Sequence, residues 1–175
     1  GSCINNPYSV IWQAIEKDGP DFLLLLGDNL YLKESEWTDI EKVRAHYSSQ
    51  FSSPFLFHLI SSVPTFAIWD DHDFGPNDSD SSFAFKNVTR QVFHEQWKNP
   101  PSPNGLEESV AFKLDFDWFE VLMTDDRSYR INPSPGKTGV YFGQKQLDWV
   151  LSELKNSSKK LIILAVGNQL TSQVG

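Results

Sequence analysis

The sequence has little cysteine and no long apolar segment. Its 175 residues include one cysteine, Cys3, which excludes an internal disulfide and a zinc site built from paired cysteines. A single cysteine says little about the compartment. No run of the roughly 18 apolar residues that a membrane helix needs is present, so the sequence predicts no membrane span. It shows no signal peptide either.

Basic residues are also scarce. The sequence has 15 Lys and Arg against 23 Asp and Glu, which gives a formal net charge of −8. A protein that binds the nucleic-acid backbone needs a basic surface, so we expect no nucleic-acid partner. A small phosphate-containing substrate is not excluded, because a bound metal reverses the local field. Nothing in the sequence indicates the oligomeric state.

Several catalytic signatures are missing. The sequence contains neither a glycine-rich phosphate loop nor a Gly-x-Ser-x-Gly nucleophile elbow, which argues against nucleotide-binding folds of those types and against a serine hydrolase. Hydrophobic residues make up 39% of the chain and aromatic residues 14%, as in globular proteins. We expect a single domain over residues 1–175.

Apolar periodicity predicts alternating helices and buried strands, and therefore an α/β layered fold. One face of the last predicted helix carries Leu147, Val150, Leu151 and Leu154. The last predicted strand, "LIILAV", is a continuous apolar run of the kind buried on both faces. The predicted helices are 7–18, 40–51, 54–61, 83–97 and 143–156, and the predicted strands are 22–26, 65–69, 110–114, 119–123 and 161–166.

Polar residues follow the predicted strands. In open α/β sheets, ligands bind at the carboxyl ends of the strands, so these segments are the candidate site. They are "GDNLY" (27–31), "DDHDFGPND" (70–78), "TDDRSYR" (124–130) and "GNQ" (167–169).

Each motif has a functional and a plain interpretation. Gly-Asp-Asn after a strand is often only a turn, so Asp28 and Tyr31 are weak candidates when taken alone. His72 lies between two carboxylates directly after a buried strand, which favours a metal ligand or a proton donor. Arg127 suits bidentate phosphate contacts, but it could equally neutralise Asp125 or Asp126.

Together the motifs resemble the alkaline phosphatase D branch of the calcineurin-like metallophosphoesterases. The long segment around "WDDHD" is the most specific part of the resemblance. The matching segments are "GSC" (1–3), "LGDNLY" (26–31), "VPTFAIWDDHDFGPNDSD" (63–80), "DDRSYR" (125–130), "FGQKQLDWVLSELKNSS" (142–158) and "AVGNQ" (165–169).

The resemblance implies an α-β-β-α sandwich and hydrolysis of phosphate esters at a binuclear metal centre, with a metal-bound hydroxide as nucleophile. It implies Fe³⁺ and Ca²⁺, a small phosphate-ester substrate and a periplasmic, secreted or cell-surface location. His72 would be the catalytic histidine, and Arg127 would hold a non-reacting oxygen. The implied metal ligands are Cys3, Asp28, Tyr31, Asp71 and, as a weaker match, Asn77.

The sequence departs from the family in one respect. The family's remaining metal ligands lie on a later strand, in a segment that these 175 residues lack, so we expect an incomplete, N-terminal part of such an enzyme. Two alternatives stay open. The first is a non-catalytic chain, either a module that binds metal or phosphate or an inactive fragment of the enzyme. The second is a plain structural calcium site. The last leaves Cys3, Tyr31 and His72 unexplained.

Overall fold

The computed structural model describes residues 1–170, which fold into six helices and five strands. The first sheet pairs β1 with β2 in parallel, and in the second β4 lies antiparallel to β3 and parallel to β5. The helices are α1 (Ile11–Lys17), α2 (Ile40–Gln50), α3 (Pro54–Ser62), α4 (Asp71–Phe74), α5 (Lys86–Gln96) and α6 (Gly143–Asn156). The strands are β1 (Leu23–Leu26), β2 (Thr65–Ile68), β3 (Phe112–Asp115), β4 (Phe119–Met123) and β5 (Leu161–Ala165).

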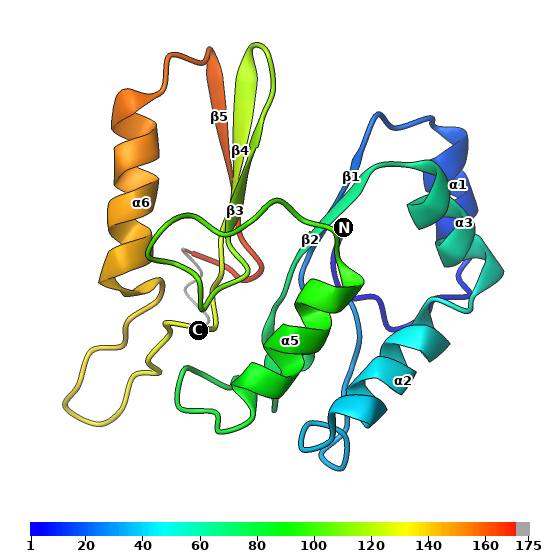
Figure 1. Ribbon diagram of the computed structural model, residues 1–175, viewed down its shortest axis with the longest axis horizontal. Coiled ribbons are helices and arrows are strands. Elements are labelled where there is room, and N and C mark those ends of the chain that lie inside the picture. The colour runs from blue at the N-terminus through cyan, green and yellow to red at the C-terminus, as the bar shows by residue number, and fades with distance from the viewer. Residues whose placement is uncertain (171–175) are drawn as a thin grey trace.

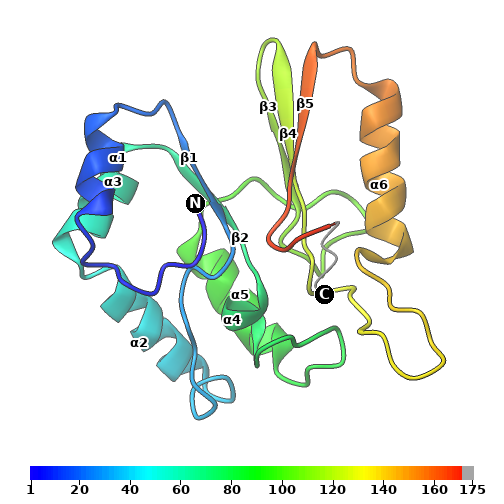
Figure 2. The same cartoon turned by 180° about the vertical axis from the view of Figure 1, so that it is seen from behind.

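The two sheets lie between helices, as Figures 1 and 2 show. Helix α6 flanks the sheet of β3, β4 and β5, and helices α1, α2 and α3 lie beyond the sheet of β1 and β2. This arrangement confirms the predicted α/β layering. Rings from both parts of the chain meet between the sheets, where the centroids of Phe66 and Phe112 are 6.3 Å apart.

The first sheet is short and well buried. Leu25 on β1 pairs in register with Ala67 on β2, and both side chains are fully buried. Because the strands are parallel, their carboxyl ends lie side by side at one edge of the sheet. The segments that follow Leu26 and Ile68 therefore start next to each other.

The structure differs from the predicted elements at the first helix and after β2. The first helix begins at Ile11 instead of Pro7, because the Asn6 carbonyl accepts the Ser9 N–H and closes a separate turn ahead of it. Residues 71–74, where no helix was predicted, form the short helix α4. Acidic residues in the first turn of a helix are favourable, and the buried ring of Phe74 anchors this one.

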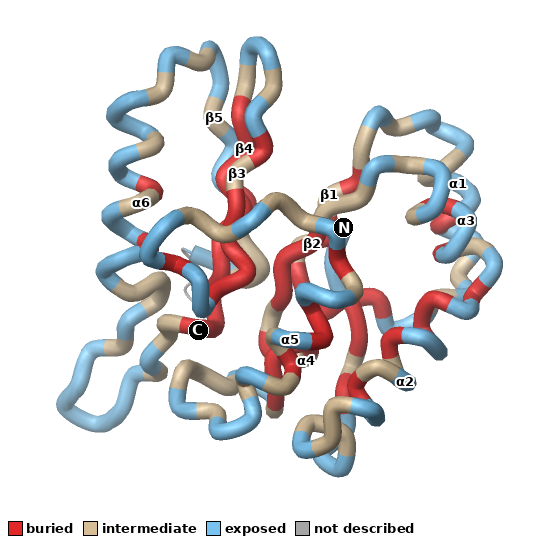
Figure 3. Tube along the Cα trace, in the orientation of Figure 1, coloured by how far each residue is buried: buried red, intermediate tan, exposed pale blue. Residues whose placement is uncertain are grey.

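The prediction that residues 161–166 form a buried strand was also wrong. Leu161, Ile163 and Leu164 of β5 are exposed, and among the described residues β5 pairs only with β4 (Figure 3). Helix α6 has the predicted bounds. Of the four residues on its predicted apolar face, however, only Val150 is buried. A continuous apolar run predicts a strand, but it does not show whether that strand has one or two neighbouring strands in the sheet.

No helix in the described part of the chain has the length and hydropathy needed to cross a membrane.

Candidate metal centre

The candidate site forms where the turns after β1 and β2 meet. Gly27 has a φ of +92°, and a Cβ there would lie 2.6 Å from Cβ of Asp70. Any larger residue would push the two turns apart, which explains glycine at this position. The next residue, Asp28, also adopts a left-handed conformation, with φ of +51°. The close approach brings Asp28 to the start of α4.

The carboxylate of Asp28 is the centre of the cluster. One ligand atom from each of Asp28, Asp71 and His72 lies within 4.8 Å of the others. The hydroxyl of Tyr31 donates to Oδ2 of Asp28 at 3.1 Å, and the thiol of Cys3 contacts the same oxygen at 3.7 Å. The backbone N–H of His72 donates to Oδ1 at 3.4 Å. Four of the predicted site residues, Cys3, Tyr31, Asp71 and His72, therefore gather around the carboxylate of a fifth, Asp28.

The site concentrates negative charge. Burial, together with Asp70 and Asp71, raises the pKa of Asp28 above its ordinary value. Burial and the neighbouring Asp28 likewise raise the pKa of Tyr31. The Tyr31 ring packs against the His72 ring, with centroids 4.5 Å apart. A bound cation would reverse these shifts, because it favours the charged form of each oxygen.

Asp73 joins the two turns behind the cluster. It is 2% exposed, and its carboxylate accepts the Asn29 N–H at 3.0 Å and the Asp70 N–H at 3.1 Å. Burial raises the pKa of Asp73 well above its ordinary value. Asn29 in turn donates to the Ile68 carbonyl at 2.9 Å. Sequence reasoning missed these supporting roles, because the run of acids does not show which carboxylate faces inward.

Asn77 lies outside the cluster. Its side chain is exposed, and its amide donates to Asp78 at 2.6 Å. The nearest connection to the cluster runs through the next residue, because the Asp78 N–H donates to Oδ2 of Asp71 at 2.7 Å. The structure thus brings the loop to Asp71 but turns the Asn77 amide toward Asp78.

Arg127 is buried in an ion-pair network. Its side chain is 0% exposed, and its guanidinium pairs with the Asp70 carboxylate. It also lies 3.9 Å from Asp71 and 3.9 Å from Asp126, and it donates to the Ser79 carbonyl at 3.2 Å. Of the two interpretations of Arg127, these contacts favour charge neutralisation, although the partner is Asp70 more closely than Asp126.

The donor set fits metal ions. Carboxylate oxygens of Asp28 and Asp71 are hard ligands of the kind that Ca²⁺ binds. The Cys3 thiol and the Tyr31 hydroxyl both contact the Asp28 carboxylate, and a thiolate with a phenolate suits iron. The imidazole of His72 lies beside the carboxylates of Asp28 and Asp71. Cys3, Asp28, Tyr31 and Asp71 could hold cations once their protons are lost.

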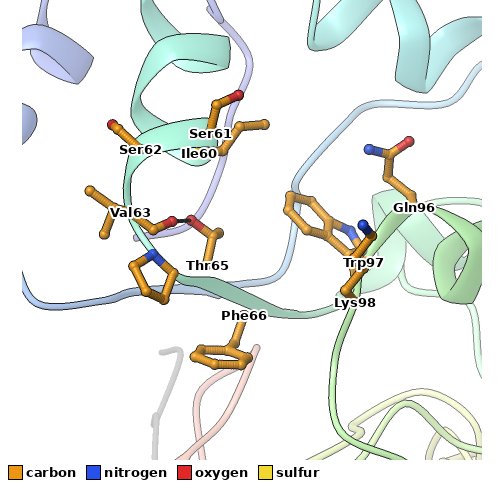
Figure 4. Close-up of a pocket in the computed structure, with 10 residues that line it drawn as sticks. Ile60, Ser61, Ser62, Val63, Thr65, Phe66, Gln96, Trp97 and Lys98 are labelled. Atoms are coloured by element: carbon orange, nitrogen blue, oxygen red, sulfur yellow. Dashed lines mark hydrogen bonds between the residues drawn. The ribbon is translucent and has the colours of Figure 1, made fainter.

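A separate depression lies elsewhere on the molecule. It measures about 600 Å³ and is lined by residues 60–66 and 96–98, including Thr65, Trp97 and Lys98 (Figure 4). Thr65 is the first residue of β2, whereas the cluster follows the last one. The depression thus lies at the opposite strand end and contains none of the candidate site residues.

Comparison with known proteins identifies the family and supports the fold. The family described as PhoD-like phosphatase matches residues 1–174. A solved chain titled "Structure of PhoD" superposes with a TM-score of 0.74 at 18% identity, covering 94% of this chain and 40% of that one. No curated protein matches the sequence significantly. Because the family match extends over nearly the whole sequence, the chain belongs to the PhoD-like phosphatases.

Proposed function

We propose that this chain carries one side of a binuclear metal centre that hydrolyses phosphate mono- or diesters. The observation that carries the proposal is the convergence of Cys3, Tyr31 and His72 on the Asp28 carboxylate, with Asp71 beside it. A carboxylate has two oxygens, and each of them can bind a different cation. The chain spans 40% of the solved PhoD chain. The hydrolytic activity of a complete enzyme is therefore itself a proposal.

The chemistry supplied by bound cations is the activation of water and the polarisation of phosphoryl oxygens. The residues of the chain would hold and orient them. Asp28 would bridge, Cys3 and Tyr31 would bind an Fe³⁺ ion, and Asp71 would bind a Ca²⁺ ion, with Asn77 as a further ligand that would have to turn away from Asp78. The left-handed backbone at Asp28 would help to place its carboxylate in the cluster.

His72 would donate a proton to the leaving oxygen. Its imidazole stands beside the two carboxylates and against the Tyr31 ring, which limits the orientations that it can take. Arg127 is proposed as a positioning residue, because its buried guanidinium holds Asp70 and the start of α4. In that place it would orient Asp71 and His72 instead of touching substrate.

The proposed substrate is a small phosphate ester, and the proposed location is the periplasm, the cell surface or the medium. A net charge of −8 supports a small substrate over a nucleic-acid duplex, because the chain lacks the positive charge that would attract one.

Hydrolysis of bis-p-nitrophenyl phosphate tests the proposal. With Fe³⁺ and Ca²⁺ present, Asp28→Asn and His72→Ala should each lower the rate by about 10² to 10⁴-fold. Asp28→Asn removes the bridging charge, and His72→Ala removes the proton donor. Chelation of the metal should abolish the remaining turnover.

Exposed residues of the same types provide matched controls. Asp117 and His58 are exposed, so Asp117→Asn and His58→Ala should leave the rate unchanged. Full activity in Asp28→Asn and His72→Ala would contradict the proposal.

The second candidate function is metal binding without catalysis. It is favoured by the burial of Arg127 in an ion pair with Asp70, because that cation is then not free to bind a phosphoryl oxygen. Calorimetry that detects Ca²⁺ or Fe³⁺ binding, with no turnover of mono- or diesters, would select this alternative.

A further inference from the structure

A buried amide on α2 bridges the two turns that carry Cys3 and Asp28. Gln50, the last residue of α2, is 9% exposed. Its Nε2 donates to the Ile4 carbonyl at 2.6 Å and to the Asn29 carbonyl at 3.0 Å. Both hydrogens of one amide are thus spent on the residues that directly follow Cys3 and Asp28.

The two turns match each other closely. Cys3 and Asp28 both have left-handed backbones, with φ of +59° and +51°, which residues other than glycine seldom adopt. The backbones also pair directly, because the Ile4 N–H donates to the Asp28 carbonyl at 2.7 Å and the Cys3 N–H to the Gly27 carbonyl at 3.2 Å. Unusual conformations of this kind persist only where the surroundings enforce them.

We propose that Gln50 is a positioning residue that fixes the Cys3 turn against the Asp28 turn. It thereby sets the distance between the Cys3 sulfur and the Asp28 carboxylate, 3.7 Å in the structure. The role in metal binding rests on the proposed function, but the effect on the Cys3 turn does not. Without the amide, two buried carbonyls lose this donor, and the turns are joined by the backbone pairing and the contact of the Cys3 thiol with Asp28.

A second buried glutamine offers a matched control. Gln146 on α6 is fully buried, and its amide donates to the Asp125 carbonyl at 2.6 Å and accepts the Asp125 N–H at 2.8 Å. It too bonds only to backbone, with a third, longer contact to the Phe142 carbonyl at 3.5 Å, but it holds no residue of the Cys3 or Asp28 turn. Gln50→Met and Gln146→Met therefore each remove a buried amide that bonds to backbone groups, from two different places.

Two measurements on these variants separate positioning from plain stability. The first is binding of Co²⁺, followed by the thiolate charge-transfer absorption that reports a Cys3–metal bond. The second is the rate at which iodoacetamide alkylates Cys3, the single cysteine, without metal. Gln50→Met should weaken Co²⁺ binding about 10 to 100-fold and change the alkylation rate about tenfold. Gln146→Met should shift neither by more than about twofold.

Equal effects of the two variants on binding and alkylation would overturn the proposal. If the wild-type protein shows no Co²⁺ absorption, the proposed metal centre fails, and the alkylation rates alone then decide the role of Gln50. If Gln50→Met does not fold, hydrogen exchange of the Ile4 amide in the wild type decides it. If the Ile4 amide exchanges only when the whole protein unfolds, the result supports the proposal. If it exchanges through local opening of the Cys3 turn, the proposal is overturned.

Discussion

Two acidic turns satisfy their carboxylates in different ways. In the turns after β1 and β2, Asp28 lies against Asp71, and its hydrogen-bond donors are the Cys3 thiol, the Tyr31 hydroxyl and the His72 N–H. In the turn after β4, Asp125 is fully buried and accepts five hydrogen bonds. They come from the Trp69 indole, the Val110, Arg127 and Ser128 N–H groups and the Ser128 hydroxyl.

The difference teaches how to distinguish a structural acid from a candidate ligand. Donors from four different residues saturate the lone pairs of Asp125 and leave no room for a cation. Two of the donors to Asp28, by contrast, are a thiol and a phenol, which can lose their protons and become ligands. Asp28 also has a raised pKa, caused by burial and by Asp70 and Asp71. We therefore expect stability to depend on the Asp125 turn, and metal affinity on the Asp28 turn.

The largest effect on stability is expected at Asp125. Asp125→Ala removes the acceptor of five donors, several of them buried, and should lower the free energy of unfolding by about 4 kcal/mol. Urea denaturation measures this loss, with Asp117→Ala at an exposed site as the control. A loss below about 1 kcal/mol would erase the contrast between the two turns.

A smaller effect is expected at the ion pair of Arg127 and Asp70, which joins the turn after β4 to the turn after β2. Arg127→Met leaves the Asp70 carboxylate unpaired beside Asp71, which should cost about 3 kcal/mol. Asp70→Asn in the same protein should recover part of that loss, since the orphaned charge disappears. Additive losses in the double variant would show that the pair is not coupled.

An exposed arginine provides the comparison for this cycle. Arg44 forms ion pairs with Glu41 and Glu95 at the surface, so Arg44→Met should cost much less stability than Arg127→Met. If both arginine variants lose the same stability, burial of Arg127 has no special role.

The pairing of the strands explains how much of the site was predictable. Parallel neighbours β1 and β2 place the residues after Leu26 and Ile68 together, so the pattern of strands followed by polar residues was enough to predict that Asp28 and Asp71 meet. Helix α6 and strand β4 have the predicted bounds, because their apolar spacing is regular and their ends carry clear breaks.

The remaining features depend on contacts between distant segments. Arg127 pairs with Asp70 across 57 positions of the chain, and no local spacing separates that pairing from one with Asp126. Gln50 has no recognisable motif, yet its amide reaches Ile4 across 46 positions. The run "LIILA" in β5 has the composition of a central strand but occupies an edge in the described part of the chain.

The smallest expected effect sharpens the comparison at the surface. Asp80 is only partly buried, but its carboxylate accepts the Asn132 N–H at 2.9 Å, the Ser82 N–H at 3.0 Å and the Ser82 hydroxyl at 2.6 Å. These donors, first the Asn132 N–H, lower the pKa of Asp80 below its ordinary value. Asp80 thus has the chemistry of Asp125 with much less burial.

Because the pKa of Asp80 is lower in the folded than in the unfolded state, its contribution to stability is present above the ordinary range of aspartate and is lost as pH falls through the folded-state value. Asp80→Asn should therefore lower the melting temperature by about 2 °C at pH 6 and by almost nothing near pH 2, with the two proteins compared at each pH by calorimetry. If the difference in melting temperature stayed constant down to pH 2, the loss would come from packing of the Asp80 side chain and not from its charge. The comparison of Asp80 with Asp125 as hydrogen-bonded carboxylates would then fail.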